Sequence, residues 1–404
     1  MSSPQETGTG TGDAVTRARA LLQLRRPEGA EREARGALAR DPEDGEAHGV
    51  LALALSARGR ADEAVAEAGE AVRLMPGTWW PHHVAAFVLW KADRDRAGLA
   101  AARAALRIDP TRAATWDVIA RLHLSLKEWW LAVQAAQRGL ACDPENSDLV
   151  SLQSLALTEL ANAPGAVALA AEAVRLDPEE QLAHLAAGHA ALAAKDRQAA
   201  ARAFREALRL APGSDHAREL LVIALKQRDP VYRALFRWLN GLGRQHLRLP
   251  LALWIPFHIV VAVGHWALWT ASAAGTLRLA RDPYYRMLLP GREIRAAWLS
   301  AGAVAAGALT FAAGVVRGRA DLAAAGVAMA ALVTPVQETC TVTAQRERMI
   351  LGGWTVLLTL AITTVVVLSA VAPSPATVGL PLALLAVATV WPAQSLKRKA
   401  RRSR

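Results

Sequence analysis

A proline recurs at a constant interval through the first half of this chain of 404 residues. The six prolines are Pro42, Pro76, Pro110, Pro144, Pro178 and Pro212. Proline has no N–H group with which to continue a helix, and it disfavours helical geometry in the residue before it. Each proline therefore marks a place where a helix has ended. An uninterrupted period of about 34 residues predicts a solenoid built from one repeated pair of helices.

Small residues follow the same register as the prolines. One position of the period holds Ala18, Ala52, Ala86, Ala120, Ser154 and Gly188 in turn. Two further positions, occupied by Ala132 and Gly139 in the fourth period, hold only alanine or glycine in all six. Small side chains at fixed places let two antiparallel helices approach closely, while larger apolar residues fill the space between them.

These positions resemble the motif of the tetratricopeptide repeat (TPR) family. Trp116 in the fourth repeat, and Gly188, Phe204 and Ala207 in the sixth, also stand where the family has such residues. The resemblance covers residues 11–214 and implies an all-α, right-handed solenoid of six repeats. The repeats are 11–44, 45–78, 79–112, 113–146, 147–180 and 181–214. We expect a disordered tail at 1–10 and a capping helix at 215–229, since the last repeat needs a cover for its apolar face.

Known TPR domains are adaptors, and the resemblance implies that the first helix of each repeat lines a concave groove for a peptide or a helix. Carried over by position, the groove residues in repeats three and four are Trp80, His83, Phe87, Trp90, Asp117, Arg121 and Leu124. Asp148 and Ser151 occupy such positions in repeat five. Because interface hot spots favour clustered aromatic residues, the third repeat is the predicted anchor for the partner. The alternative is that these tryptophans pack between repeats.

One TPR subclass holds acidic chaperone tails with a lysine and an asparagine one turn apart. The corresponding positions here hold other residues, such as His83 and Phe87 in the third repeat. The sequence therefore predicts a partly apolar ligand rather than such a tail.

The second half of the chain is both apolar and basic. Residues 1–230 hold 28 basic and 31 acidic residues, whereas residues 231–404 hold 19 basic and five acidic ones. Four apolar stretches approach the roughly 20 residues that a transmembrane helix needs, at 296–316, 320–340, 350–372 and 376–393. Their apolar cores hold no ionisable residue, which argues against an ion path. These features predict a multi-pass membrane protein that contacts lipids and does not bind nucleic acid.

Residues 230–295 connect the two halves and contain a further apolar segment at 249–275. Arginines flank both ends of this segment, and Pro250 and Pro256 weaken a straight helix at its start. If it lies in the membrane interface or is re-entrant, the TPR domain is cytoplasmic. If it is a fifth span, that domain lies outside. The interfacial alternative is favoured, so we expect the TPR domain at the cytoplasmic face of the membrane.

The last residues, 395–404, form a basic tail that the positive-inside rule places in the cytoplasm. Its basic residues can also attract anionic lipids. They are Lys397, Arg398, Lys399, Arg401, Arg402 and Arg404. Arginine outnumbers lysine 41 to 6 and alanine is abundant, a composition typical of GC-rich bacteria. The predicted location is therefore the cell (inner) membrane of a bacterium.

Candidate sites for chemistry are weak. His258 and His265 lie two turns apart, but no Asp, Glu or Cys accompanies them as a further metal ligand. Cys340 has no neighbouring histidine to act as a base. We therefore expect no metal, no cofactor and no enzymatic activity. The sequence predicts a membrane-anchored TPR adaptor that binds a protein partner. The alternative is a channel or small-solute carrier whose TPR domain is a regulatory sensor.

Overall fold

The computed structural model describes residues 6–243, 251–341, 345–371 and 379–389, and these residues form helices and short connections with no strand. The chain divides into two compact units, 1–217 and 218–404, which we call unit 1 and unit 2. The all-α prediction is confirmed for the described residues.

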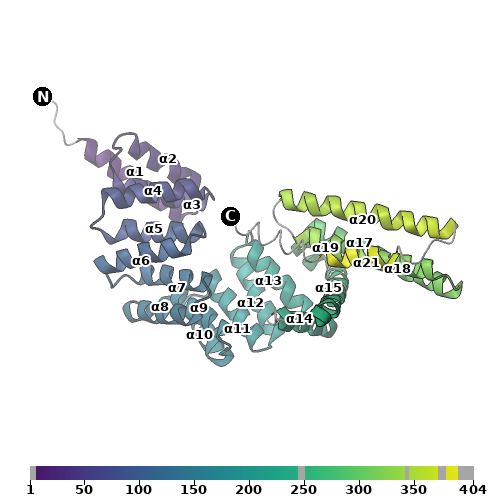
Figure 1. The fold of residues 1–404 in the computed structure, drawn as a ribbon. Helices are drawn as coiled ribbons and strands as arrows, with labels where there is room; N and C mark the ends of the chain where they lie inside the picture. The colour runs from purple at the N-terminus through teal and green to yellow at the C-terminus, as the bar shows by residue number, and fades with distance from the viewer. Residues whose placement is uncertain (1–5, 244–250, 342–344, 372–378, 390–404) are drawn as a thin grey trace. The chain divides into compact units, whose positions relative to one another are not determined.

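Unit 1 contains six consecutive pairs of helices that pack in sequence order (Figure 1). The first helices of the pairs are α1 (Glu6–Gln23), α3 (Gly45–Ala57), α5 (Trp79–Lys91), α7 (Ala113–Ser125), α9 (Ser147–Glu159) and α11 (Gln181–Ala193). The second helices are α2 (Pro27–Leu38), α4 (Ala61–Leu74), α6 (Asp95–Ile108), α8 (Trp129–Cys142), α10 (Ala163–Leu176) and α12 (Arg197–Leu210). From α5 onward each first helix begins one full proline period after the preceding one, and each recurrent proline follows the end of a second helix. Unit 1 is a solenoid of the TPR type, as predicted.

A left-handed residue ends the first helix of every pair. These residues are Arg25, Gly59, Asp93, Lys127, Ala161 and Lys195, with φ between 56° and 75°. After α9, the Ala161 N–H donates to the Thr158 carbonyl and the Asn162 N–H donates to the Leu157 carbonyl. This pattern satisfies carbonyls at the helix end and normally uses glycine at the left-handed position. Glycine occupies it only in the second repeat, so little in the sequence indicates the turn.

The recurrent small residues lie at the closest contacts within each pair. A Cβ placed on Gly188 would lie 2.2 Å from Cε1 of Phe204, whose side chain is fully buried. In the fifth pair, Ser154 Oγ donates to the Ala166 carbonyl at 2.8 Å, which joins two of the small-residue positions directly. Alanine, glycine or serine is needed at these places because a larger side chain would separate the helices.

The first helices form a continuous layer. Each one packs against the second helix of its own pair and also against the first helix of the next pair. We call the outer surface of this layer the first-helix face. It corresponds to the predicted groove-lining side of the TPR domain.

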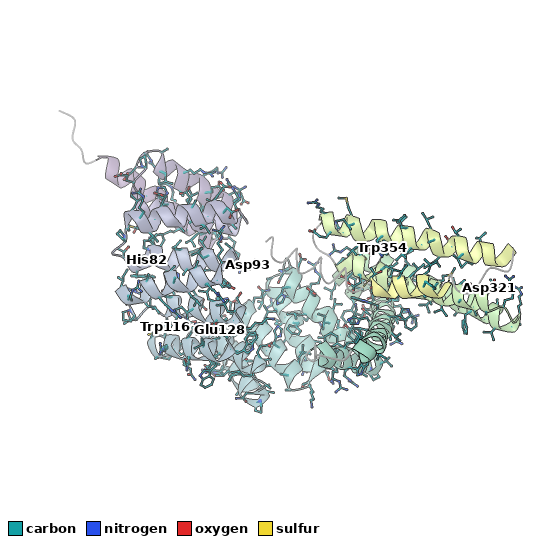
Figure 2. The ribbon with its side chains drawn as sticks, viewed as in Figure 1. His82, Asp93, Trp116, Glu128, Asp321 and Trp354 are labelled. Atoms are coloured by element: carbon teal, nitrogen blue, oxygen red, sulfur yellow. The ribbon has the colours of Figure 1, made fainter. Side chains whose placement is uncertain are left out.

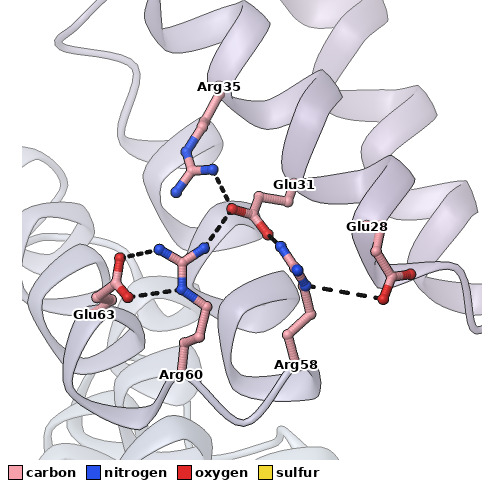
Figure 3. A network of polar contacts seen from close by, with 6 residues as sticks. All are labelled: Glu28, Glu31, Arg35, Arg58, Arg60 and Glu63. Atoms are coloured by element: carbon pink, nitrogen blue, oxygen red, sulfur yellow. Dashed lines mark hydrogen bonds and ion pairs between the residues drawn. The ribbon is translucent and has the colours of Figure 1, made fainter.

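A network of charged residues joins the first two repeats (Figure 3). The Glu31 carboxylate is 2% exposed and pairs with the guanidinium groups of Arg35, Arg58 and Arg60. Burial alone would raise the pKa of Glu31. The hydrogen bond from Arg58 and the charges of the three arginines outweigh burial, so the pKa is lowered from its ordinary 4.5. The buried carboxylate is therefore ionised at neutral pH and holds arginines of α2 and of the α3–α4 turn together.

Unit 2 is also helical. After α13 (Asp215–Lys226), which spans the boundary, it contains α14 (Pro230–Gly243), α15 (Leu251–Leu279), α16 (Pro283–Leu288), α17 (Gly291–Val316), α18 (Ala320–Ala331), α19 (Val333–Thr341), α20 (Gln345–Val371) and α21 (Gly379–Ala388). In the part of the chain that the structure describes, three stretches are long and apolar enough to cross a membrane: Gly291–Val316, Ala320–Cys340 and Arg346–Val367.

Glycines bring α17 and α18 together. A Cβ on Gly307 would lie 2.6 Å from the carbonyl oxygen of Gly326, and one on Gly314 would lie 2.4 Å from the backbone nitrogen of Ala323. Close contacts of this kind through small residues are typical of helices that pack within membranes. Large apolar side chains such as Leu309 and Val316 face away from the rest of unit 2, at 73% and 86% exposed.

Three sequence expectations need correction. Helix α1 begins at Glu6, so residues 6–10 of the expected disordered tail are helical, as an extension of the helix that buries Ala14 and Ala18. The re-entrant interpretation of 249–275 is wrong for its described part, because 251–279 is one continuous helix that passes through Pro256. Finally, the stretch Ala320–Cys340 contains Glu338, which is 2% exposed, so a buried ionisable residue does lie in a candidate span. The ends of the predicted span 376–393 and the basic tail 395–404 lie outside the described residues.

Candidate partner-binding face

The predicted binding residues of the third repeat lie on α5, which packs between α3 and α7 in the first-helix layer. Trp80 packs on Gly49 of α3, where a Cβ would lie 2.4 Å from the indole ring. The guanidinium of Arg19 lies over the Trp80 ring at 4.8 Å and pairs with Glu46 at 3.2 Å. Glycine at position 49 thus makes room for a half-buried tryptophan, flanked by charges from the first two repeats.

His83 lies one turn further along α5 and is half-buried. Its ring meets that of Trp79 edge to face at 5.7 Å, and its Nδ1 lies 3.2 Å from Thr115 Oγ1 of α7. Burial lowers the pKa of His83, and the nearby Asp117 carboxylate only partly opposes this effect. His83 is therefore a neutral, hydrogen-bonded part of the contact between α5 and α7.

Phe87 and Trp90 form the aromatic centre of the face. Their rings meet edge to face at 5.7 Å. The Lys91 ammonium lies 4.4 Å from the centre of the Trp90 ring, and the Arg121 guanidinium of α7 lies 5.3 Å from it. Cations near an indole ring are attracted by its electron-rich face. The sequence prediction missed Lys91, whose position next to Trp90 was the available signal.

Arg121 connects three repeats. It donates from Nε to Asp117 Oδ1 at 2.7 Å, and from Nη2 to Asp148 Oδ2 of α9 at 2.9 Å. Burial on its own would lower the pKa of Arg121. The carboxylates of Asp117 and Asp148 outweigh burial, so the pKa is raised. Asp117, Arg121 and Asp148, which belong to repeats four and five, are thus brought together beside Trp90 of repeat three.

The pKa of Asp148 is raised to about 6. Burial is the main cause, and the carboxylates of Asp117, Glu180 and Asp177 add to it. The attraction of Arg121 opposes these effects without cancelling them. Three further carboxylates thus interact electrostatically with Asp148, against the single guanidinium of Arg121.

Leu124 is half-buried, as Phe87 and Trp90 are, and like them it packs against the buried apolar cluster that contains Leu122 and Leu152. It also contacts the cluster of Ala132, Val133 and Ala156. Trp116, the tryptophan of the family motif, is used structurally: its Nε1 donates to the Pro110 carbonyl at 3.1 Å, and Arg138 lies over its ring at 5.4 Å. Trp116 is labelled in Figure 2. Packing between repeats, the alternative role for the tryptophans, is thus seen for Trp116 and also for Trp80, which packs on Gly49 of the preceding repeat.

Among the residues that the structure describes, no three His, Cys, Asp or Glu side chains come close enough to hold a metal ion. His265 makes a contact of 2.8 Å from Nδ1 to the Val261 carbonyl of its own helix, while the side chain of His258 lies outside the described set. Cys142 is exposed on α8, and Cys340 is half-buried.

No family model matches this sequence, and no curated protein matches it. Solved structures do resemble it in fold. PilF of Pseudomonas aeruginosa is 18% identical, with 53% of this chain and 98% of that chain covered and a TM-score of 0.44. A chain of the APC/C hetero-tetramer Cut9–Hcn1 is 16% identical, with 52% and 42% covered and a TM-score of 0.46. A chain of the human IFIT1 dimer with m7Gppp-AAAA is 15% identical, with 67% and 72% covered and a TM-score of 0.48. Identities this low do not indicate a shared partner or activity.

Proposed function

We propose that this protein is a membrane-anchored scaffold that binds a protein partner on the first-helix face of its TPR solenoid. The observation that carries this proposal is the cluster of Trp90, Lys91, Arg121 and Asp148, which three successive repeats build on one face. Aromatic and arginine side chains with partial burial are the residues that dominate the energies of protein interfaces. A TPR solenoid offers such residues in a row, because equivalent positions of consecutive first helices lie side by side.

Membrane anchoring rests on unit 2. Its candidate spans carry large apolar side chains that face outward, as lipid contact requires. We expect the full chain to stay in the pellet when isolated membranes are washed with alkaline carbonate. Release into the supernatant would contradict anchoring by these helices.

We place the TPR domain on the cytoplasmic side of a bacterial cell membrane. The support for this side is that arginines stand at both ends of α15, which disfavours a crossing. Arg244 and Arg248 precede the helix, Arg278 lies in its last turn and Arg281 follows it. The exposed Cys142 of unit 1 offers a direct test. A membrane-impermeant maleimide should label Cys142 only after the cells are opened, with Cys142→Ser as the control. Labelling of intact cells would instead place unit 1 outside and make α15 a crossing helix.

The binding proposal is tested by recovery of partners with the full chain from solubilised native membranes. Replacing Trp80 and Trp90 by alanine should remove specific partners while helix content is kept. The matched control is Trp130→Ala, which removes a tryptophan that is 62% exposed on the second helix α8. Equal partner recovery from all three proteins would overturn the proposal.

One observation favours a second candidate function, a small-solute carrier regulated by the TPR domain. Glu338 is buried in a candidate span that is interrupted between α18 and α19, and Trp269 Nε1 donates to its Oε1 at 3.2 Å. Buried ionisable residues and interrupted helices mark transport sites in membrane proteins. Solute flux into liposomes that contain the full chain, lost in Glu338→Gln, would support this function.

A further inference from the structure

The carboxylates on the first-helix face outnumber the cations that they contact. Asp117 and Asp148 share one guanidinium, that of Arg121, and Glu180 lies close enough to interact with both Arg121 and Asp148. The other cation nearby is Lys91, whose ammonium lies over the rings of Trp90 and Phe87. We call Asp117, Asp148 and Glu180 the carboxylate cluster. It draws its members from α7, from α9 and from the residue that caps α11.

The way in which Arg121 binds leaves acceptor oxygens unused. A guanidinium usually meets one carboxylate with two parallel hydrogen bonds, but Arg121 gives one bond to Asp117 and one to Asp148. The second oxygens, Asp117 Oδ2 and Asp148 Oδ1, have no hydrogen-bond partner among the described residues. A carboxylate oxygen can only accept, so each of these atoms needs an N–H or O–H donor.

Ser151 gives an independent indication at the same place. It lies one turn after Asp148 on α9, its side chain is fully buried, and its Oγ has no hydrogen-bond partner in the described part of the chain. Buried polar side chains in folded proteins are normally hydrogen-bonded, and exceptions call for an explanation. Three such atoms, on Asp117, Asp148 and Ser151, thus occur on the two neighbouring helices α7 and α9.

We propose that the first-helix face at α7 and α9 recognises a partner segment by an arginine or lysine side chain, which the carboxylates of Asp117 and Asp148 bind beside the Trp90 ring. This inference rests on the proposed scaffold function and names the chemistry of its partner. The incoming cation brings N–H donors and a positive charge to the Asp148 side chain, which is 39% exposed, while the unpartnered oxygens themselves are buried. Its aliphatic part packs on the half-buried aromatic pair Phe87 and Trp90, where a planar guanidinium can also stack.

The electrostatic surroundings favour a cation over an anion. Four carboxylates lie around this site, those of Asp117, Asp148, Glu180 and Asp177. They would repel an acidic ligand and attract a basic one. The raised pKa of Asp148 is consistent with a basic ligand, because a further positive charge would stabilise the ionised form of this carboxyl group. The other titratable groups that face this site are Lys91 and the neutral His83 of α5. A basic ligand should therefore bind more tightly at pH 7.5 than at pH 5, where Asp148 is protonated.

The test uses the full chain in lipid nanodiscs and fluorescence anisotropy with labelled peptides. One peptide alternates leucine and arginine, and a second has glutamate in place of each arginine. We expect the arginine peptide to bind and the glutamate peptide to bind far more weakly. Because a hydrogen bond to a charged group is lost, Asp148→Asn should weaken binding of the arginine peptide about tenfold. Glu159→Gln, an exposed carboxylate at the far end of α9, should leave binding unchanged.

A second variant changes binding in the opposite direction, so simple loss of structure cannot imitate the result. Arg121→Gln frees both carboxylates and should tighten binding of the arginine peptide. The double change Asp117→Asn with Asp148→Asn should shift preference toward the glutamate peptide, since Arg121 and Lys91 then dominate the site. Equal binding of the two peptides, no binding of either, or indifference to Asp148→Asn would overturn the inference. In those cases, partner loss in the Trp80 and Trp90 double variant would still support the scaffold function.

Discussion

Each first helix ends at a left-handed residue, so we predict that glycine at such a position, in place of a residue with a Cβ, stabilises this protein. Ala161 has φ of 60°, is exposed, and lies in a turn whose hydrogen bonds are backbone only. The left-handed conformation costs a residue with a Cβ about 1–2 kcal/mol, and glycine avoids this cost. Glycine also makes the unfolded chain more flexible, which costs about 0.4–1 kcal/mol. Ala161→Gly should therefore stabilise unit 1 by about 0.5–1 kcal/mol as the balance of these two effects.

The assay is thermal unfolding of the full chain in detergent, followed by helix circular dichroism. For a domain of this size, 1 kcal/mol corresponds to about 2–4 °C, so Ala161→Gly should raise the melting temperature by a few degrees. Gly59→Ala, at the equivalent position with φ of 75°, should lower it by a similar amount. Gly213→Ala, where a Cβ would meet nothing within 4 Å and φ is not left-handed, should instead raise it slightly, because alanine makes the unfolded chain less flexible. A lower melting temperature for Ala161→Gly would refute the assignment of a left-handed turn to this position and to its equivalents in the other repeats.

Three further predictions concern the stability of unit 1. Gly188→Ala should lower the melting temperature, since overpacking against the buried Phe204 costs about 1–3 kcal/mol. Gly69 is also helical, but a Cβ there would meet nothing within 4 Å, so Gly69→Ala should raise the melting temperature. Glu31→Gln should lower the melting temperature at pH 7 through loss of its arginine contacts. Because the folded pKa of Glu31 is lowered from 4.5, the difference from the unchanged protein should be full above about pH 4.5 and disappear as the pH falls further. Burial and the charge of His216 lower the pKa of His189 to about 4, from an ordinary 6.5. The folded state therefore resists protonation, and stability should fall between pH 6.5 and 4 by up to about 1.4 kcal/mol per pH unit; melting curves of His189→Leu should show a smaller decline.

The sequence predicted the repeated helix packing well, but it predicted few of the contacts between charged side chains. The proline period and the small residues predicted the helix pairs, because proline limits helix length and small side chains set helix separation. The left-handed turns were not predicted, since Ala161, Lys127 and the other non-glycine residues there carry no turn signal. Offsets carried over from the TPR family led to Trp90, Arg121 and Leu124, which are all half-buried on first helices. The contact of Arg121 with Asp148 joins residues 27 apart, which a pattern within one repeat cannot show.

In unit 2, composition predicted apolar helices but not their details. The break between α18 and α19 lies just before Pro335, which has no N–H to donate to the Ala331 carbonyl, so the sequence did hold a local signal for it. Helix α15 instead continues through Pro256, against the local preference of proline. Burial of Glu338 depends on neighbours, because Trp269 lies 69 positions earlier in the chain. Such features arise from tertiary packing, which overrides local preference.

The central claim, that the first-helix face of a membrane-held TPR solenoid binds a protein, is tested most directly by site-specific photo-crosslinking in native membranes. A benzophenone amino acid would replace Trp90 on α5 in one protein and Trp130 on α8 in another. The account predicts a discrete crosslinked protein from position 90, absent from position 130 and reduced when Asp117 and Asp148 are both changed to asparagine. Crosslinks of equal yield from both positions, or none from position 90 in membranes that contain the intact chain, would contradict it.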